Sequence, residues 1–264
     1  MSRSWRPLAV LAVAALSLVG CGGGGSAGQP NAGAVGGGAV TGEVTVFAAA
    51  SLTESFTQLG KQFEAAHPGT SVKFNFGGSS GLAQQINNGA PADVFASASP
   101  TNMKQVSDAG GVSGQPTTFA RNTLQIAVAK GNPKHISSLA DVTKPDIRLA
   151  LCAEQVPCGA AAKQAFHAAN LAPKPVTLEQ DVKATLTKVQ LGEVDAALVY
   201  RTDVAATNGK VDGADFPEAA KAVNDYPIAT LAKAPHGAAG KAFVDYVLSP
   251  EGHEALKKAG FDAP

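Results

Sequence analysis

The segment Gly77-Gly78-Ser79-Ser80-Gly81 contains residue types that could do chemistry in two different ways. The pattern G-x-S-x-G is typical of the nucleophile elbow of serine hydrolases, in which a sharp turn from a strand into a helix exposes a serine hydroxyl. The same small residues ahead of a helix also leave backbone N–H groups free to cradle an anion. Ser79 is therefore a candidate nucleophile or a candidate ligand-binding residue.

A hydrolase would also need an acid and a histidine after the serine. Asp195 or Asp203, followed by His236, provides that order. However, the pattern follows only the second predicted strand, and no HGGG-like oxyanion segment precedes it. His236 lies in the sequence Ala-Pro-His-Gly, which is typical of an exposed turn. The sequence therefore favours an anion cradle over a catalytic serine, and we expect that the chain is not an enzyme.

Four predicted helix starts share the donor character of the Ser79 segment. Ser51 begins the capping-box pattern S-x-x-E, which predicts that it caps the helix behind it. Pro157 is favourable in a first turn, and Asp181 could cap a helix that begins at Val182. These corners offer hydroxyls and backbone N–H groups but no Lys or Arg; they lie at Ser51, Ser79–Ser80, Pro157–Gly159 and Asp181–Val182.

A site built only from hydrogen-bond donors would select among anions. Each helix N-terminus carries roughly half a positive charge, so a few of them can stabilise a dianion without a cationic side chain. A protonated anion needs an acceptor, whereas a fully deprotonated tetrahedral oxyanion does not. A single serine of this kind is explained by helix capping alone. If the corners converge, the sequence predicts molybdate, tungstate or sulfate as the ligand rather than hydrogen phosphate.

Predicted strands and helices alternate along the chain in an order that could bring the corners together. The segments 44–47 and 72–76 are predicted strands that run into the two serine corners. Segments 148–151 and 196–200 are predicted strands of the second half. The alternation predicts an α/β fold with mainly parallel sheets flanked by helices. In such sheets, ligands bind at the carboxyl ends of the strands.

The composition argues against several other partners and ligands. The 264 residues include 21 Lys and Arg and 21 Asp and Glu, and 6% are aromatic, so nucleic acid is not expected as a partner. No histidine lies at ligand spacing from Cys152 or Cys158, which argues against a metal site. Tyr200, Tyr226 and Tyr246 are far apart in sequence, unlike the adjacent tyrosines of many ferric-iron sites. We expect no cofactor and no residue that ligates a metal cation directly.

The first 42 residues have the pattern of an export signal followed by a tether. Arg3 and Arg6 precede an apolar run at 8–19 that is too short for a comfortable membrane span. The run ends in Leu-Val-Gly-Cys21, which resembles the lipobox of bacterial lipoproteins and implies cleavage before Cys21 and a lipid on its sulfur. An ordinary signal peptide with a chance cysteine is the alternative. Residues 21–42 are rich in glycine and predict a flexible tether, so we expect a protein anchored on the outer face of the cytoplasmic membrane.

Two cysteines, Cys152 and Cys158, belong to the predicted folded part. In an exported protein the default is a disulfide, which would close a short loop and contribute about 2 kcal/mol. Two free thiols are the alternative, because the sequence does not show whether the two Cα atoms come close enough.

Several of these segments together resemble the molybdate-binding protein of bacterial ABC importers. They are VTVFAAASLTESF, GGSSGLAQQI, GAPADVFASA, the EQDV segment and the LVYRTD segment. The resemblance covers most of the chain from about Val44 to Phe261. It implies the two-lobed (type II) fold of periplasmic binding proteins, with an anion held between the lobes. It also implies a monomer that delivers its ligand to a permease and its ATPase.

The resemblance further implies which residues bind the anion. In the first lobe, Ser51 and Ser79 would donate through their hydroxyls and backbone N–H groups. In the second, Val182 would donate its backbone N–H and Tyr200 its hydroxyl, although a core tyrosine at a strand end would explain Tyr200 as well. Cys158 departs from the family pattern, in which a small residue donates its backbone N–H from this position. A disulfide to Cys152 would stiffen that corner, whereas a free thiol could crowd the ligand.

The domain division follows from the same resemblance. Residues 1–20 would be the signal peptide and 21–42 the lipidated tether. Residues 43–122 plus 227–264 would form the first lobe and 123–226 the second, with hinge crossings near 121–123 and 225–227. A sulfate or thiosulfate binder of similar fold would use the same donors, and the sequence does not supply the cavity volume that distinguishes these anions.

Overall fold

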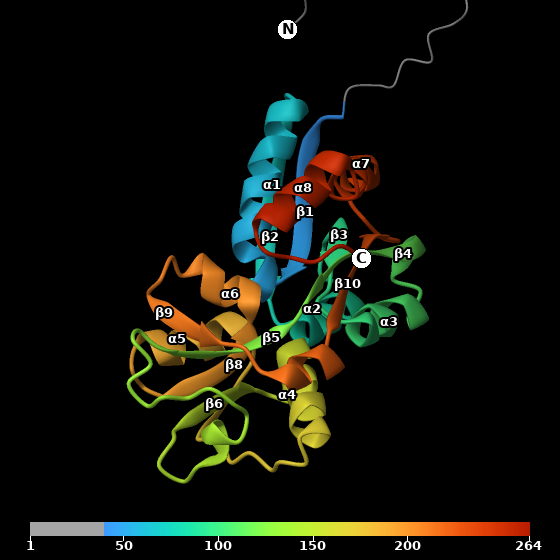
Figure 1. The fold of residues 1–264 in the computed structure, drawn as a ribbon. Coiled ribbons are helices and arrows are strands. Elements are labelled where there is room, and N and C mark those ends of the chain that lie inside the picture. The colour runs from blue at the N-terminus through green and yellow to red at the C-terminus, as the bar shows by residue number, and fades with distance from the viewer. Residues whose placement is uncertain (1–39) are drawn as a thin grey trace, which may run out of the picture. The chain divides into compact units, whose positions relative to one another are not determined.

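The computed structural model describes residues 40–264; the predicted signal peptide, the lipidation site Cys21 and most of the tether lie outside the described residues. Two five-stranded sheets form the framework of the described part (Figure 1). Their strand orders are β2-β1-β3-β10-β4 and β7-β6-β8-β5-β9. In each sheet the first three strands run parallel, as expected, and the remaining pairs are antiparallel. We call the first sheet with its helices the first lobe and the second sheet with its helices the second lobe.

The first lobe carries helices on both faces of its sheet because apolar side chains alternate along the strands. Val44 and Val46 of β1 face one core, whereas Phe47 faces the other. The strands are β1 (Gly42–Ala49), β2 (Thr70–Gly77), β3 (Val94–Ala96), β4 (Val112–Asn122) and β10 (Asn224–Leu231). Helices α1 (Thr53–Ala66), α7 (Gly237–Val247) and α8 (Pro250–Lys258) supply the first core, and α2 (Ser79–Asn87) and α3 (Pro100–Asp108) supply the second.

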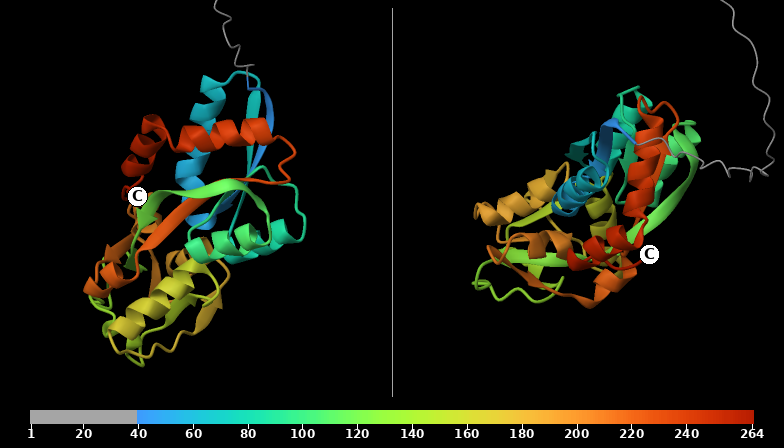
Figure 2. Two further views of the ribbon diagram at one scale, coloured as in Figure 1. Left: turned by 90° about the vertical axis from the view of Figure 1, so that its right-hand side faces the viewer. Right: turned by 90° about the horizontal axis from the view of Figure 1, so that it is seen from above.

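The second lobe is built around a single core of mostly aliphatic residues. Its strands are β5 (Leu124–Ala129), β6 (Leu149–Cys152), β7 (Thr177–Glu179), β8 (Ala196–Tyr200) and β9 (Val211–Ala214). Its helices are α4 (Pro157–Ala168), α5 (Val182–Gln190) and α6 (Arg201–Ala206), with short 3-10 turns η2 (Asp141–Thr143) and η3 (Pro217–Lys221). Figure 2 shows the same two lobes from two further sides.

The strand registers bring the predicted corners side by side. Ala49 and Gly77, the last residues of β1 and β2, pair with each other, so the two strands end side by side in the first sheet. In the second sheet Cys152 of β6 pairs with Glu179 of β7, which aligns the corners before α4 and α5. Within residues 40–264, every helix is too short or too polar to cross a membrane.

One local prediction is wrong: Ser51 does not cap a helix. It lies inside the 3-10 turn η1 (Ala50–Leu52), and the N-cap position of α1 is Leu52, with no side-chain capping bond. Tertiary partners explain the difference, because the Ser51 hydroxyl lies 2.9 Å from Tyr226 Oη and Glu54 pairs with Lys183. The predicted cap at Asp181 is confirmed, since its carboxylate accepts a hydrogen bond from the Ala184 N–H at 2.9 Å.

Candidate functional site

A small pocket with a volume of about 10 Å³ lies between the carboxyl ends of the parallel strands of the two sheets. This volume is far below the roughly 300–1,000 Å³ of sites for drug-sized molecules, so only a very small ligand could be enclosed there. The pocket brings together all five residues predicted to bind the ligand: Ser51, Ser79, Cys158, Val182 and Tyr200. The rest of its lining consists of Ala49, Ala50, Gly77, Gly78, Ala98, Val156, Pro157 and Asp181.

The corner of the first lobe at α2 supplies a hydroxyl and free backbone N–H groups. Gly78 is the N-cap of α2, and the first intrahelical bond runs from the Leu82 N–H to the Gly78 carbonyl at 3.0 Å. The N–H groups of the preceding turn, including that of Ser79, therefore have no acceptor within the helix. Ser79 Oγ accepts a hydrogen bond from the Ala98 N–H at 3.0 Å. The Ser79 hydroxyl proton is thus left to donate to a ligand.

The corner at α4 is held by a covalent bond. Cys152, the last residue of β6, forms a disulfide with Cys158, the second residue of α4. Pro157 occupies the first turn, as predicted, and the first intrahelical bond joins the Ala160 N–H to the Val156 carbonyl. The backbone N–H of Cys158 therefore precedes the hydrogen-bonded part of the helix and has no intrahelical acceptor.

The corner at α5 is held by its capping aspartate. The Asp181 carboxylate accepts a hydrogen bond from the N–H of Ala184, one of the helix-start donors that lack an intrahelical acceptor. The N–H of Val182 is not used by this cap, and Val182 lines the pocket. Asp181 and Val182 both line the pocket, but the Asp181 carboxylate is already hydrogen-bonded to its own helix.

Tyr200 supplies a buried hydroxyl without a protein partner. Its side chain is 1% exposed, it lines the pocket, and its Oη makes no hydrogen bond within residues 40–264. Burial, together with the neighbouring Tyr226 and Asp203, raises the pKa of Tyr200 well above its usual value, so the phenol keeps its proton. An unpaired buried hydroxyl costs free energy, and a bound acceptor would recover it.

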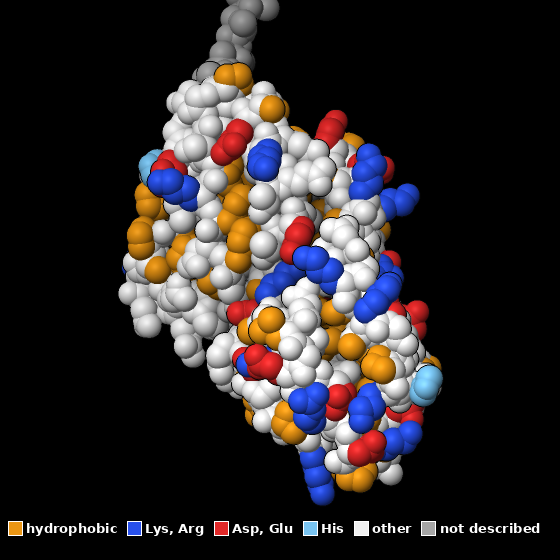
Figure 3. All heavy atoms as spheres, turned by 90° about the vertical axis from the view of Figure 1, so that its left-hand side faces the viewer, with side chains coloured by type: hydrophobic (Ala, Val, Ile, Leu, Met, Phe, Trp, Pro, Cys, Tyr) orange, Lys and Arg blue, Asp and Glu red, His pale blue; other side chains and the backbone are white. Residues whose placement is uncertain are grey.

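The electrostatics of the pocket come from helix ends rather than from cationic side chains. No Lys or Arg lines it, and its one charged residue is the capping Asp181. The starts of η1 with α1, α2, α4 and α5 all reach the lining, and each contributes partial positive charge. On the face drawn in Figure 3, acidic and basic side chains are interspersed rather than gathered in one basic patch. The arrangement can bind a small anion through neutral donors.

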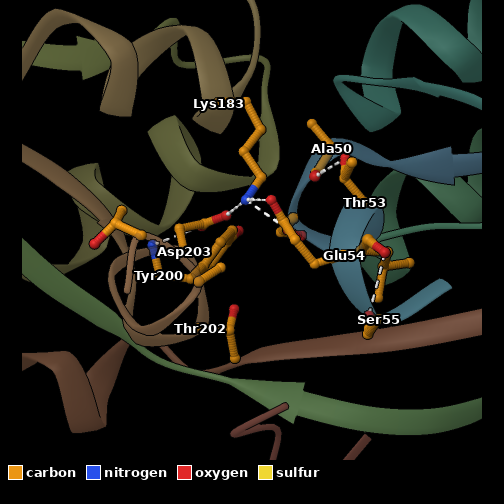
Figure 4. A network of polar contacts seen from close by, with 12 residues as sticks. Ala50, Thr53, Glu54, Ser55, Lys183, Tyr200, Thr202 and Asp203 are labelled. Atoms are coloured by element: carbon orange, nitrogen blue, oxygen red, sulfur yellow. Dashed lines mark hydrogen bonds and ion pairs between the residues drawn. The ribbon is translucent and has the colours of Figure 1, made fainter. Parts of the chain in front are cut away.

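An ion-pair network that the sequence did not predict joins the lobes beside the pocket (Figure 4). Lys183 Nζ lies 2.8 and 2.9 Å from the carboxylate oxygens of Glu54 in the first lobe, and 3.0 Å from Asp203 Oδ1 in its own lobe. Asp203 is completely buried and accepts a hydrogen bond from the Tyr200 N–H at 3.1 Å. Burial raises the pKa of Asp203, and Lys183 opposes that rise. Glu54 and Lys183 are 129 residues apart, so no local pattern could have indicated the pair.

The residues of the hydrolase alternative are engaged elsewhere. The backbone N–H of His236 donates to Asp93 at 2.6 Å, and its ring Nδ1 lies 3.4 Å from the same carboxylate. Asp203 is bound to Lys183, and Asp195 pairs with Arg148, which lowers the pKa of Asp195. Ser79 Oγ accepts from the Ala98 backbone N–H, and none of the histidines within residues 40–264 is hydrogen-bonded to it as a base would be. Within residues 40–264, no group of three or more His, Cys, Asp or Glu side chains could hold a metal ion.

Sequence reasoning also missed how closely the lobes approach at Gly78. A Cβ atom on this glycine would clash with the backbone carbonyl oxygen of Gln180 in the second lobe. The φ of Gly78 is −62°, which any residue adopts, so the requirement for glycine is purely steric. Its place inside G-x-S-x-G was the available signal, but the crowding depends on a residue of the other lobe that is far away in the sequence.

Comparisons with known proteins show what this chain is similar to. Residues 44–262 match the family model described as bacterial extracellular solute-binding protein. The molybdate-binding protein ModA of Mycobacterium tuberculosis (strain H37Rv) is 45% identical over 221 residues, which are 84% of this chain and 85% of that protein.

Two solved structures share the fold. The periplasmic molybdate-binding protein of Azotobacter vinelandii has a TM-score of 0.75 at 21% identity, over 84% of this chain and 99% of that one. The sulfate-binding protein SubI of Mycobacterium tuberculosis H37Rv has a TM-score of 0.74 at 18% identity, over 84% of this chain and 86% of that one.

Proposed function

The chain belongs to the molybdate-binding proteins among the bacterial extracellular solute-binding proteins, and we propose that it captures molybdate, and tungstate as well, and delivers the anion to an ABC importer. It is an extracytoplasmic binding protein and not an enzyme. The proposed ligand contacts are the hydroxyls of Ser51, Ser79 and Tyr200 and the backbone N–H groups of Ser51, Ser79, Cys158 and Val182.

The observation that carries the proposal is the Tyr200 hydroxyl. It is buried and has no hydrogen-bond partner within residues 40–264, and it lies in a pocket that several helix starts reach and that no described Lys or Arg lines. Asn224 Oδ1 is also buried without a partner, but Asn224 does not line the pocket. A fully deprotonated tetrahedral anion accepts at every oxygen and would satisfy the free donors without requiring an acceptor in return.

Delivery requires that the permease distinguish the loaded from the empty protein. The proposed division assigns residues 43–122 plus 227–264 to the first lobe and 123–226 to the second, with hinge crossings near 121–123 and 225–227. Because β10 enters the first sheet at Asn224, the crossing residues 224–226 are counted with the first lobe when the lobes are defined by their sheets. An anion held by both lobes favours the closed form, which is the form the permease would recognise. A lipid on Cys21 and a tether over residues 21–42 would keep a monomer near the membrane.

Calorimetric titration of the purified protein with molybdate, tungstate, sulfate and inorganic phosphate tests the proposal. We expect tight binding of molybdate and tungstate and no binding of phosphate. Sulfate binding tighter than molybdate binding would instead favour the sulfate or thiosulfate alternative. If none of the four anions gives a binding heat, the proposed function is wrong.

Replacement of Tyr200 by Phe tests the site itself. The loss of its hydroxyl should weaken molybdate binding by about 1–3 kcal/mol, because one donor to a charged acceptor is removed. The matched control is Tyr246→Phe in α7, a half-buried tyrosine outside the pocket lining, which should leave the affinity unchanged. An unchanged affinity in Tyr200→Phe would remove this residue from the site.

A further inference from the structure

Strand β10 of the first lobe lies behind both serine corners of the pocket. Asn224 and Tyr226 are two positions apart on this strand, so their side chains project from the same face. Asn224 Nδ2 donates to the Ala98 carbonyl at 2.7 Å, and the N–H of Ala98 donates to Ser79 Oγ. Tyr226 Oη lies 2.9 Å from Ser51 Oγ. Neither Asn224 nor Tyr226 lines the pocket.

Either hydroxyl of the Tyr226–Ser51 pair could be the donor. Tyr226 is completely buried, and burial raises its pKa, so it keeps its proton. That proton needs an acceptor, because an unpaired buried donor is costly, and Ser51 Oγ lies at hydrogen-bond distance. Ser51 lines the pocket and can direct its own proton to a ligand there. Donation from Tyr226 to Ser51 Oγ leaves the Ser51 proton free to donate to the anion.

We propose that Tyr226 is a specificity-determining residue that acts through Ser51: its hydroxyl occupies an acceptor position of the serine and turns the serine proton toward the anion. The proposal rests on the proposed function. The Ser79 hydroxyl is oriented in the same way, because the backbone N–H of Ala98 can only donate and occupies an acceptor position of Ser79 Oγ. Both serines would therefore be held as donors, Ser51 by Tyr226 outside the pocket lining and Ser79 by the backbone N–H of Ala98. This arrangement would exclude an anion that brings a proton of its own.

A double-mutant cycle in the full chain tests this coupling. Ser51→Ala, Tyr226→Phe and the double variant are titrated calorimetrically with molybdate and with inorganic phosphate at neutral pH. We expect Tyr226→Phe to weaken molybdate binding about tenfold and to narrow the ratio of molybdate to phosphate affinity. In the Ser51→Ala background, the same substitution should have no further effect on either anion. Tyr246→Phe is the control for removing a tyrosine hydroxyl elsewhere.

Three outcomes would overturn the inference. An equal loss with Ser51 present and in the Ser51→Ala background would mean that Tyr226 acts through packing alone. An unchanged affinity ratio in Tyr226→Phe would mean that it does not set specificity. If the unmodified protein binds none of the four oxyanions, both the inference and the proposed function fail, whereas molybdate binding without coupling contradicts the inference alone.

A second measurement does not depend on the folding of a variant. In the unmodified protein bound to molybdate, the buried Tyr226 hydroxyl proton should exchange slowly and show a nuclear Overhauser contact with the Ser51 β-protons. A Tyr226 hydroxyl proton directed away from Ser51 would contradict the proposed direction of donation.

Discussion

Both lobes have a five-stranded sheet with three parallel strands on one side and antiparallel pairs on the other, but they position their hydrogen-bond donors by different means. The first lobe has an aromatic core, in which Phe56 contacts Phe74, Phe119 and Phe243. Its Ser51 hydroxyl shares a hydrogen bond with Tyr226, and its Ser79 hydroxyl accepts one from the Ala98 N–H. The second lobe has a mainly aliphatic core, and its helix starts are held by a disulfide and an aspartate cap.

The comparison separates the features of the site that both lobes share from those that only one lobe has. Helix starts at the carboxyl ends of parallel strands occur in both lobes, because each sheet contains three parallel strands. The groups that orient the individual donors differ, because each lobe fills the space behind its corners with different side chains. The strongest tests of this comparison act where the lobes meet.

Removing the charge of Lys183 should have the largest effect. Lys183→Met leaves the buried carboxylate of Asp203 without its cation, and we expect a loss of about 3 kcal/mol in the free energy of unfolding, measured with denaturant. Lys188→Met on the same helix is the control, because its pair with Glu193 is more exposed and should contribute less than about 1 kcal/mol. The double variant Lys183→Met with Asp203→Asn should recover stability; equal losses in Lys183→Met and Lys188→Met would contradict this account.

Substitution of Gly78 should weaken ligand binding, by hindering closure of the lobes, without lowering the stability of the fold. In Gly78→Ala the new methyl group would meet the Gln180 carbonyl, so the closed arrangement becomes unfavourable and molybdate affinity should fall about 100-fold. Stability should change little, because the backbone conformation suits alanine. Gly81→Ala is the matched control, since a Cβ there has open space around it. Similar affinities for the two variants would show that the contact with Gln180 does not limit closure.

Breaking the disulfide tests the covalent support of the second lobe. Replacing Cys152 and Cys158 together by alanine should lower the free energy of unfolding by about 2 kcal/mol, since a short loop is no longer closed in the unfolded chain. Reductant should destabilise the unmodified protein by a similar amount and leave the double variant unaffected. If reductant destabilises both proteins equally, its effect does not arise from this bond.

Alkaline pH should have the smallest effect. Deprotonation of Tyr200 or Tyr226 would place a negative charge beside the anion, so binding would be lost as pH rises through the pKa of either residue. Burial raises the pKa of both residues, so this loss lies above the ordinary tyrosine value of about 10. Molybdate affinity should therefore stay within about twofold between pH 8 and 10 by calorimetry. A midpoint of loss below pH 10 would contradict the environment described for the two tyrosines.

Much of the fold was predictable because it depends on local patterns. Strand β8 has the predicted bounds Ala196–Tyr200, and the cap at Asp181 was predicted from its position before an apolar helical pattern. The prediction that Ser51 caps a helix is wrong, because the Ser51 hydroxyl is hydrogen-bonded to Tyr226, which is distant in the sequence. The S-x-x-E pattern is real, but Tyr226 and Lys183 engage its two functional side chains.

The sequence by itself determined the donor character of this protein: glycine, serine and backbone N–H groups at helix starts, with no Lys or Arg among them. These properties follow from residue type and short-range spacing. Tertiary structure alone decided that the corners share one pocket, that Tyr200 is left unpaired there, and that Lys183 bridges to Glu54. It also placed Tyr226 behind Ser51. These contacts join segments far apart in the chain, and packing and strand register set them rather than any local propensity.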